Sequence, residues 1–261
     1  MIKCFVINLK RRKDRLKKIS NHLDSNGLKF IKFEAIDAEK SSYSLLNKNI
    51  AQGGGPLGNI PKGDLACFQS HYSLWKHIAK NENNPVLILE DDVRISNLGF
   101  KLLNDITWIP KDSKIIKIER FGNNKHRILV SPLLNTRFNF NLHYLLSKHS
   151  GTGGYIVTPE GAKFLIKKSA NVNVSVDHYL FNPNNSNIFS ELKPIQILPA
   201  ICEQVDSSSD IHIHRDKFSL LSFFDVIKEL KRGYYEIRLL PKQLYQLLFK
   251  NCILIKPNIS D

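Results

Sequence analysis

The sequence contains little sulfur: 261 residues include four cysteines and one methionine. Cys4, Cys67, Cys202 and Cys252 are widely separated, and their spacing matches no common zinc-binding motif. Cys4 and Cys67 lie within apolar patterns, so we expect them to be small core residues. The cysteine pattern therefore argues against a zinc module, and a reducing cytoplasm fits it best.

Long hydrophobic runs are also lacking. The apolar run at residues 4–7 is too short for the core of a signal peptide, and no stretch approaches the length of a transmembrane helix. Apolar residues make up 42% of the chain and charged residues 24%, which is ordinary for a globular protein. The length suffices for one substantial core, alone or with a small appendage.

Acidic residues are scarce relative to basic ones, 24 against 38, which gives a net charge of +14. Residues 1–20 alone carry eight basic side chains and one acidic side chain. Such an excess indicates an anionic partner: nucleic acid, an anionic membrane or a phosphorylated substrate. Charge alone does not choose among them.

The most informative segment joins an apolar run to three acids. Residues 86–89 (VLIL) are followed directly by Glu90, Asp91 and Asp92. The run is typical of a strand buried on both faces, and ligands of open α/β sheets bind beyond the carboxyl ends of the strands. Oxygen ligands there predict a divalent cation with a phosphate on its other side. The alternative is a solvated turn or the start of a helix.

The rest of the pattern predicts an α/β fold. A strand at residues 3–9, a helix with Leu16, Ile19 and Leu23 on one face, and a strand at residues 30–36 form the strand–helix–strand unit of parallel sheets. Further along we expect a helix over 64–81, with Trp75 in the core, and a helix ending near residue 168 that is capped by Thr158. Strands are expected at 115–118, 152–157 and 195–198. The loop at 51–63, rich in Gly and Pro, is either simply mobile or a flap over a ligand.

From Phe218 onward the composition changes. We expect one catalytic domain over residues 1–210 and a basic, helical C-terminal extension over residues 211–261, with amphipathic segments at about 218–231 and 234–249. This extension either lies on the anionic inner face of the inner membrane, or caps the core and contributes a homodimer contact.

Several motifs together resemble the family 25 glycosyltransferases, which include bacterial lipooligosaccharide sugar transferases and the collagen galactosyltransferases. The segments that carry the resemblance are 6–9 with Arg12, Asp14 and Arg15; 33–37; 63–75; 87–93; and, more weakly, 154–162 with Asp177. Asp64 and Ala66 depart mildly from the family pattern, which usually has Glu and Gly there. The C-terminal extension lies outside the resemblance.

The resemblance implies an inverting glycosyltransferase with a GT-A-like fold, a single Rossmann-type nucleotide-sugar domain with a mostly parallel central sheet. It also implies a UDP-sugar donor, most commonly UDP-galactose, and a lipooligosaccharide or surface-glycan acceptor. Mn²⁺ or Mg²⁺ suits carboxylate and phosphate oxygens and would stabilise the departing diphosphate.

The resemblance also implies roles for single residues. Asp92, supported by Glu90, is expected to hold the metal, and a late histidine, His212 or His214, to complete the site. Donor contacts are expected from Asn8, Arg12, Glu34, Asp37, His71 and Asp91. For Arg12 the alternative is a solvated helix start, for Asp37 an exposed turn, and for His71 a structural role. Arg15 is expected to pair with Asp14 or with a neighbouring carboxylate.

Inversion requires a base opposite the leaving group, and a carboxylate is the usual choice. Asp177 is the candidate, with Glu119 and Glu203 in reserve; the alternative for Asp177 is a surface turn. Two other functions remain open: a metal-dependent phosphodiesterase or nuclease, and a basic membrane- or nucleic-acid-binding module without enzymatic activity. Aromatics are absent between Lys10 and Lys18, so no nucleic-acid partner is expected.

Overall fold

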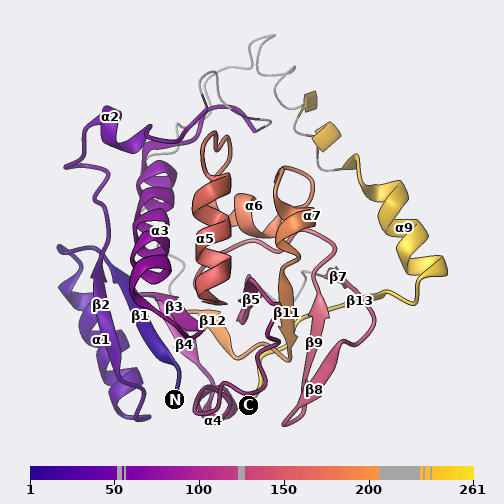
Figure 1. Cartoon of the computed structure of the whole chain (residues 1–261), viewed down its shortest axis with the longest axis horizontal. Coiled ribbons are helices and arrows are strands. Elements are labelled where there is room, and N and C mark those ends of the chain that lie inside the picture. The colour runs from indigo at the N-terminus through magenta and orange to yellow at the C-terminus, as the bar shows by residue number, and fades with distance from the viewer. Residues whose placement is uncertain (52–54, 56, 123–126, 206–229, 232, 236) are drawn as a thin grey trace.

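A large sheet with strand order β2-β1-β3-β10-β5-β11-β9-β8 forms the centre of the computed structural model (Figure 1). The structure describes residues 1–51, 55, 57–122, 127–205, 230–231, 233–235 and 237–261. Two small sheets, β4-β12-β6 and β13-β7, accompany it. The fold is therefore α/β, as expected.

The strands are β1 (Lys3–Asn8), β2 (Phe30–Glu34), β3 (Val86–Glu90), β4 (Val93–Ile95), β5 (Ile115–Lys117), β6 (Glu119–Arg120), β7 (Ile128–Val130), β8 (Asn135–Arg137), β9 (Phe140–Tyr144), β10 (Gly154–Val157), β11 (Ile195–Leu198), β12 (Cys202–Gln204) and β13 (Ile253–Ile255). The helices are α1 (Lys13–Asp24), α2 (Tyr43–Leu46), α3 (Lys62–Asn81), α4 (Asn97–Leu103), α5 (Pro159–Lys168), α6 (Val176–Phe181), α7 (Phe189–Leu192) and α9 (Leu240–Phe249).

The central sheet is mixed, which corrects the expectation of a mostly parallel one. β1 is parallel to β2 and to β3, and β5 is parallel to β11. β10, however, is antiparallel to both β3 and β5, and β9 is antiparallel to β11 and β8. The chain enters β10 beside the carboxyl end of β3, where Glu90 N donates to Gly153 O at 2.9 Å, so β10 has to run back from that end.

Helices cover both faces of the sheet, and the strand residues alternate between two cores. Phe5, Val86 and Ile88 face the core built with α3, α5 and α6. Their neighbours Cys4 and Leu87 face the second core, built with α1 and α4. Val86 to Leu89 are fully buried because both faces of β3 are covered.

Local signals place two helices as the sequence predicts. Thr158 Oγ1 accepts from Gly161 N at 3.0 Å, so Thr158 caps α5. A Cβ at Gly161 would lie 2.0 Å from the carbonyl oxygen of Lys114, so this close approach requires glycine. Trp75, on α3, is fully buried, as expected.

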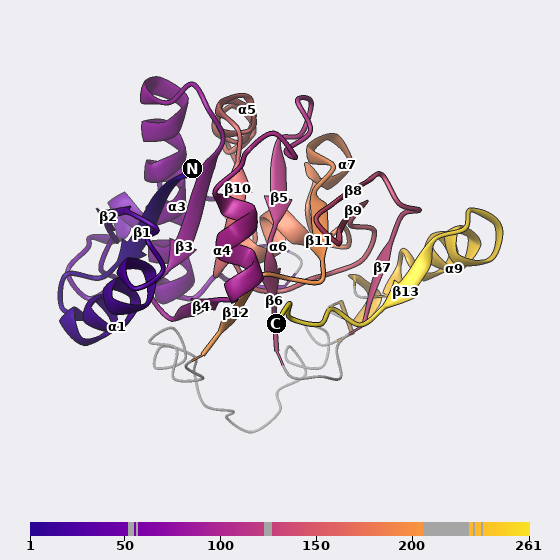
Figure 2. The same cartoon turned by 90° about the horizontal axis from the view of Figure 1, so that it is seen from below.

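α9 lies at the periphery, on the opposite side from α1 in both views, whereas the C-terminus returns toward the middle (Figures 1 and 2). α9 falls within the expected amphipathic stretch at 234–249, whereas most of 218–231 lies outside the described residues. After α9 the chain forms β13, which was not predicted and pairs with β7. Within the described ranges, no helix is both long and apolar enough to cross a bilayer.

Candidate active site

The carboxyl ends of β1 and β3 lie side by side and bring Asn8 next to the acids of β3. In this register Ile7 pairs with Glu90. Asn8 Nδ2 donates to Asp91 Oδ2 at 2.6 Å and to the carbonyl oxygen of Arg12 at 3.0 Å. Asn8 is almost completely buried. It therefore holds the acidic tip, defined here as Glu90, Asp91 and Asp92, against the first basic turn.

Arg15 links α1 to the acidic tip. Arg15 Nη1 lies 3.2 Å from Asp91 Oδ1 and 3.3 Å from Asp92 Oδ2. The three side chains are each at most 10% exposed. Arg15 thus pairs with neighbouring carboxylates, one of the two expectations, and the cation compensates part of the cost of burying two acids.

Asp92 remains only partly compensated. Its Oδ1 atom is buried and has no hydrogen-bond partner among the described residues. Burial, followed by the charge of Glu90, raises the pKa of Asp92 to about 8, despite Arg15. An additional positive charge at this carboxylate would therefore be favourable.

Glu90 faces α3 and β10. Its Oε1 atom accepts from Thr152 Oγ1 at 2.6 Å and lies 3.4 Å from His71 Nε2. Burial raises the pKa of Glu90, but His71, Thr152 and Lys117 outweigh it, so the pKa is lower than usual. Glu90 is thus ionised at neutral pH.

His71 is fully buried on α3, inside a network of aromatic residues. His71 Nδ1 lies 2.7 Å from the hydroxyl oxygen of Tyr155, which also accepts from Trp75 Nε1 at 2.9 Å. Nε2 makes no hydrogen bond within the described chain. The other ring nitrogen is therefore directed at Glu90 while Tyr155 fixes the ring.

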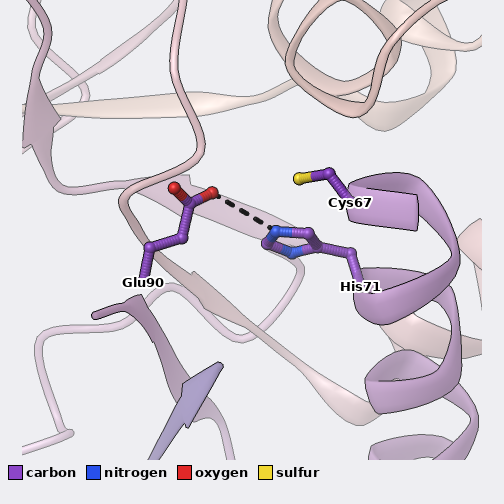
Figure 3. A group of neighbouring side chains, drawn as sticks. All are labelled: Cys67, His71 and Glu90. Atoms are coloured by element: carbon purple, nitrogen blue, oxygen red, sulfur yellow. Dashed lines mark ion pairs between the residues drawn. The ribbon is translucent and has the colours of Figure 1, made fainter. Parts of the chain in front are cut away.

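Cys67 lies one helical turn before His71, and its thiol is directed toward the space between His71 and Glu90 (Figure 3). One potential ligand atom from each of Cys67, His71 and Glu90 lies within 4.8 Å of the other two. Cys67 packs against the core as expected, but it is only half-buried. The i, i+4 spacing of Cys67 and His71 is the sequence signal that could have revealed the pair.

A pocket of about 130 Å³ opens above these groups. Its lining includes all three acids of the tip together with His71, Cys67 and Arg15. Asp37 and Arg11 also line the pocket and are joined by an ion pair of 2.8 Å. The structure therefore brings five predicted residues, Asp37, His71, Glu90, Asp91 and Asp92, to one pocket.

Three predicted donor residues do not line the pocket: Arg12, Glu34 and Asn8, whose side-chain amide is engaged with Asp91. Arg12 pairs with the exposed Asp14 at 3.0 Å, and Glu34 is exposed at the end of β2. Both lie close to the pocket in sequence, but their side chains are engaged or directed elsewhere. Their contact with the donor stays a prediction.

A buried ion pair between Lys117 and Glu119 holds the loop of residues 151–153 in place. Lys117 Nζ lies 2.8 Å from Glu119 Oε2, both side chains are inaccessible to solvent, and Lys117 also donates to the carbonyl oxygen of Gly151. Gly153 N donates to the same Glu119 oxygen at 3.1 Å. Burial raises the pKa of Glu119. Lys117 was not predicted, because nothing in its apolar strand indicates a partner two residues away.

Asp177 lies at the start of α6, on the other side of the same loop. It accepts from Ser175 Oγ at 2.5 Å and from Gly151 N at 3.5 Å. Burial raises its pKa, but His178, Ser175 and backbone amides outweigh this and keep the pKa below its usual value. Asp177 is therefore an ionised, partly buried carboxylate and not a surface turn, although it does not line the pocket.

The remaining candidates are placed away from the pocket or are not placed. Glu203 is held between Arg94, at 2.6 Å, and Arg120. His212 and His214 lie outside the described residues. Completion of a metal site by either histidine stays a prediction.

Comparison with known proteins assigns the family. The model of glycosyltransferase family 25 (LPS biosynthesis protein) matches residues 1–180. The chain belongs to glycosyltransferase family 25. A putative glycosyltransferase of Haemophilus influenzae is 28% identical over 81% of this chain and 72% of its own length. The lipooligosaccharide biosynthesis protein lic2B of the same species is 25% identical over 80% and 79%. Human procollagen galactosyltransferase 2 is 35% identical over 62% of this chain and 27% of its own length.

Family membership confirms the resemblance seen in the sequence and makes this protein a glycosyltransferase. The two rival interpretations, a phosphodiesterase or nuclease and a module without enzymatic activity, are set aside. All the residues of the pocket lie within the matched region.

Proposed function

We propose that this family 25 enzyme is an inverting, metal-dependent transferase that moves galactose from UDP-galactose to a lipooligosaccharide or surface-glycan acceptor. The observation that carries the proposal is Asp92 Oδ1, which is buried in a pocket at the carboxyl ends of β1 and β3 and has no hydrogen-bond partner among the residues that the structure describes. Such a position is where α/β sheets bind nucleotides.

The residues present fit a hard divalent cation. Asp92 would hold Mn²⁺ or Mg²⁺ with support from Glu90, because both offer carboxylate oxygens and Asp92 Oδ1 has no hydrogen-bond partner in the described part of the chain. When bound, the ion would neutralise charge that develops on the leaving diphosphate. The rise in the pKa of Asp92 is consistent with a site that is completed by a cation.

The other residues of the tip would orient the donor. Asp91 is fixed by Asn8 and Arg15, and its oxygens retain lone pairs for hydroxyl groups of the ribose or the sugar. Asp37 and Arg11 would contact the nucleotide; their place in the lining of the same pocket supports this.

Asp177 is the proposed base. Transfer forms a bond from the acceptor oxygen to the sugar carbon, breaks the bond to UDP, and delivers the hydroxyl proton of the acceptor to the carboxylate. A lowered pKa keeps Asp177 ionised and ready to accept that proton at neutral pH. It accepts from Gly151 N and, unlike the acids of the tip, does not line the pocket.

A donor screen tests the proposal. UDP release is measured with several UDP-sugars, with Mn²⁺ present or chelated. We expect release from UDP-galactose only with the ion, and loss of turnover in Asp92→Ala with the fold intact. Asp24→Asn, an exposed carboxylate on α1, is the matched control. Wild-type turnover in Asp92→Ala would contradict the metal assignment.

The base is tested separately. In Asp177→Asn we expect donor affinity to be retained and kcat to fall by about 10²–10⁴-fold, the usual contribution of a general base. A weaker donor affinity at unchanged kcat would remove Asp177 from this role.

We also propose that the segment 237–261 binds the anionic inner face of the inner membrane. None of the residues of α9 is buried, and Leu248 and Phe249 are 71% and 70% exposed. With Leu244 and Tyr245 they form one helical face. Lys242, Lys250 and two further cations accompany this face against a single acid, Asp261. An apolar face flanked by cations suits an anionic lipid surface.

Sedimentation with vesicles tests this surface. We expect binding to vesicles that contain phosphatidylglycerol, none to neutral phosphatidylcholine, and loss of binding in Leu248→Ser/Phe249→Ser. Leu134→Ser, an exposed apolar residue next to β8, is the control. A salt-independent dimer that hides this face would overturn the proposal.

A further inference from the structure

Cys67, His71 and Glu90 form a group in which only Glu90 belongs to the proposed Mn²⁺ or Mg²⁺ site; the thiol and the imidazole are not used there. Oxygen ligands select hard cations, whereas a thiolate and an imidazole select zinc and similar soft ions. Their ligand atoms lie within 4.8 Å of one another, and we describe them below as the sulfur site (Figure 3).

We propose that the sulfur site binds Zn²⁺ through Cys67 Sγ, His71 Nε2 and a Glu90 carboxylate oxygen, and that this zinc inhibits transfer.

Helix geometry presents two of the ligands together. Cys67 and His71 are one turn apart on α3, so their side chains project from the same face of the helix. Glu90 comes from the carboxyl end of β3 and closes the third side. A tetrahedral zinc site needs its ligands somewhat closer than the metal-free groups stand here, which small side-chain rotations supply.

The unpartnered nitrogen of His71 is an independent observation. His71 is fully buried, and Nε2 makes no hydrogen bond within the described chain, although it faces Glu90 Oε1 at 3.4 Å. The Glu90 carboxylate at this distance compensates the nitrogen only in part, because a buried polar atom without a hydrogen bond loses its interaction with water. A metal ion at the sulfur site would use this nitrogen.

Outer partners fix the ligands. Zinc at Nε2 requires the ring proton on Nδ1, and the Tyr155 oxygen at 2.7 Å can accept a hydrogen bond from it. Thr152 Oγ1 donates to Glu90 Oε1 at 2.6 Å and orients that carboxylate. Binding converts the thiol of Cys67 to a thiolate and releases its proton to solvent.

The pocket determines how zinc could reach the sulfur site and how it would compete with the Mn²⁺ site. All three ligands line the same pocket as Asp92, so an ion from solvent can reach them and a fourth position stays open. Glu90 is shared with the proposed Mn²⁺ site. Zinc at the sulfur site would withdraw Glu90 from that site and place a second ion where the donor enters. This inhibitory part rests on the proposed function; the binding part does not.

Cobalt absorption tests binding without any need for activity. Co²⁺ is added to the metal-free full chain, and thiolate-to-cobalt charge transfer is recorded in the near ultraviolet. We expect the band in the wild type and in Cys252→Ser, and its loss in Cys67→Ser. Zn²⁺ should abolish the band by displacement. A wild type without the band, or a band that persists in Cys67→Ser, would overturn the site.

Further variants guard against loss of fold and separate the two ions. His71→Gln should weaken Co²⁺ binding at least about tenfold while circular dichroism stays unchanged. Asp92→Asn, which removes the proposed Mn²⁺ ligand, should keep the thiolate band. Loss of the band in Asp92→Asn would mean that one merged site exists and would overturn a distinct sulfur site.

Inhibition is then measured on UDP release. We expect Zn²⁺ to inhibit wild type at the concentrations that displace Co²⁺, and Cys67→Ser to resist. Full displacement without inhibition would overturn the inhibitory role. If no UDP-sugar is turned over under any condition, the proposed donor fails, while the cobalt band still decides the metal site.

Discussion

The basic side chains near the two ends of the chain lie in opposite surroundings. Near the N-terminus, Arg11 pairs with Asp37, and Arg15 reaches the nearly buried Asp91 and Asp92. In residues 237–261, no ion pair joins a cation to an acid of the described chain, and large apolar side chains face solvent beside these cations. The cations near the N-terminus therefore compensate acids of this chain, whereas those of residues 237–261 have no acid to compensate among the described residues.

The largest expected effect on the free energy of unfolding comes from removing Arg15, an N-terminal cation that compensates buried acids. Arg15→Gln leaves Asp91 and Asp92 nearly buried without their cation, so we expect a loss of about 3–5 kcal/mol of unfolding free energy at pH 8 without metal. Urea unfolding followed by circular dichroism measures it. Arg12→Gln, which removes an exposed ion pair, should cost about 0–1 kcal/mol. Equal losses in the two variants would show that the N-terminal cations do not differ in this way.

Asp92→Asn should stabilise the metal-free protein at high pH, although it removes the proposed metal ligand. The folded-state pKa of Asp92 is raised to about 8, so the folded protein binds this proton more tightly than the unfolded chain does. The stability contributed by the protonated acid is therefore full at low pH and is lost as pH rises toward 8. The amide is neutral throughout. We expect metal-free Asp92→Asn to melt a few degrees above the wild type at pH 8 and to approach it near pH 4. Calorimetry that shows a lower melting temperature at pH 8 would contradict the partial compensation of Asp92.

Mn²⁺ should offset the loss of stability that ionised Asp92 causes in the wild type, and it should do so more strongly at high pH. At one hundred times its Kd at pH 8, a ligand of the folded state stabilises by about 2.7 kcal/mol. At pH 6 the proton competes for Asp92 and weakens binding by about fiftyfold, so the same Mn²⁺ should add less than about 1 kcal/mol. Thermal shifts at the two pH values measure this, with Asp92→Asn as the control that should not respond. Equal shifts at both pH values would place the ion elsewhere.

The smallest effect on stability is expected at the other end. Leu248→Ser/Phe249→Ser should change the unfolding free energy by less than about 0.5 kcal/mol, because both side chains are already exposed. The same calorimetric scan measures it. A clear destabilisation would mean that α9 packs on something within this chain, and the contrast between the two ends would lose its basis.

The sequence predicts the frame of this site well, because its signals are local. Four apolar residues before three acids indicate a buried strand with a polar end, and β3 ends at Glu90. Thr158 and Pro159 indicate the start of α5 in the same way. The helix expected over 64–81 is observed over Lys62–Asn81.

Features that depend on partners distant in sequence were predicted less well. The link between Asn8 and Asp91 spans 83 residues, and the contact between His71 and Tyr155 spans 84. The reversal of β10 depends on which edge of β3 the chain reaches, which apolar periodicity does not encode. Cys67 has the periodicity of a core residue, and only the approach of β3 makes its thiol a possible ligand.

The return of the chain after α9 has a consequence for how the molecule can be divided. β13 lies along β7, and the last residues reach Ala200, whose carbonyl oxygen accepts from Ser260 N at 2.8 Å. A protein shortened at residue 210 would leave β7 with a bare edge and Ala200 with unsatisfied backbone groups. The final ten residues thus hold β7 and the segment after β11 together. Removing them to obtain a minimal enzyme would destabilise both segments.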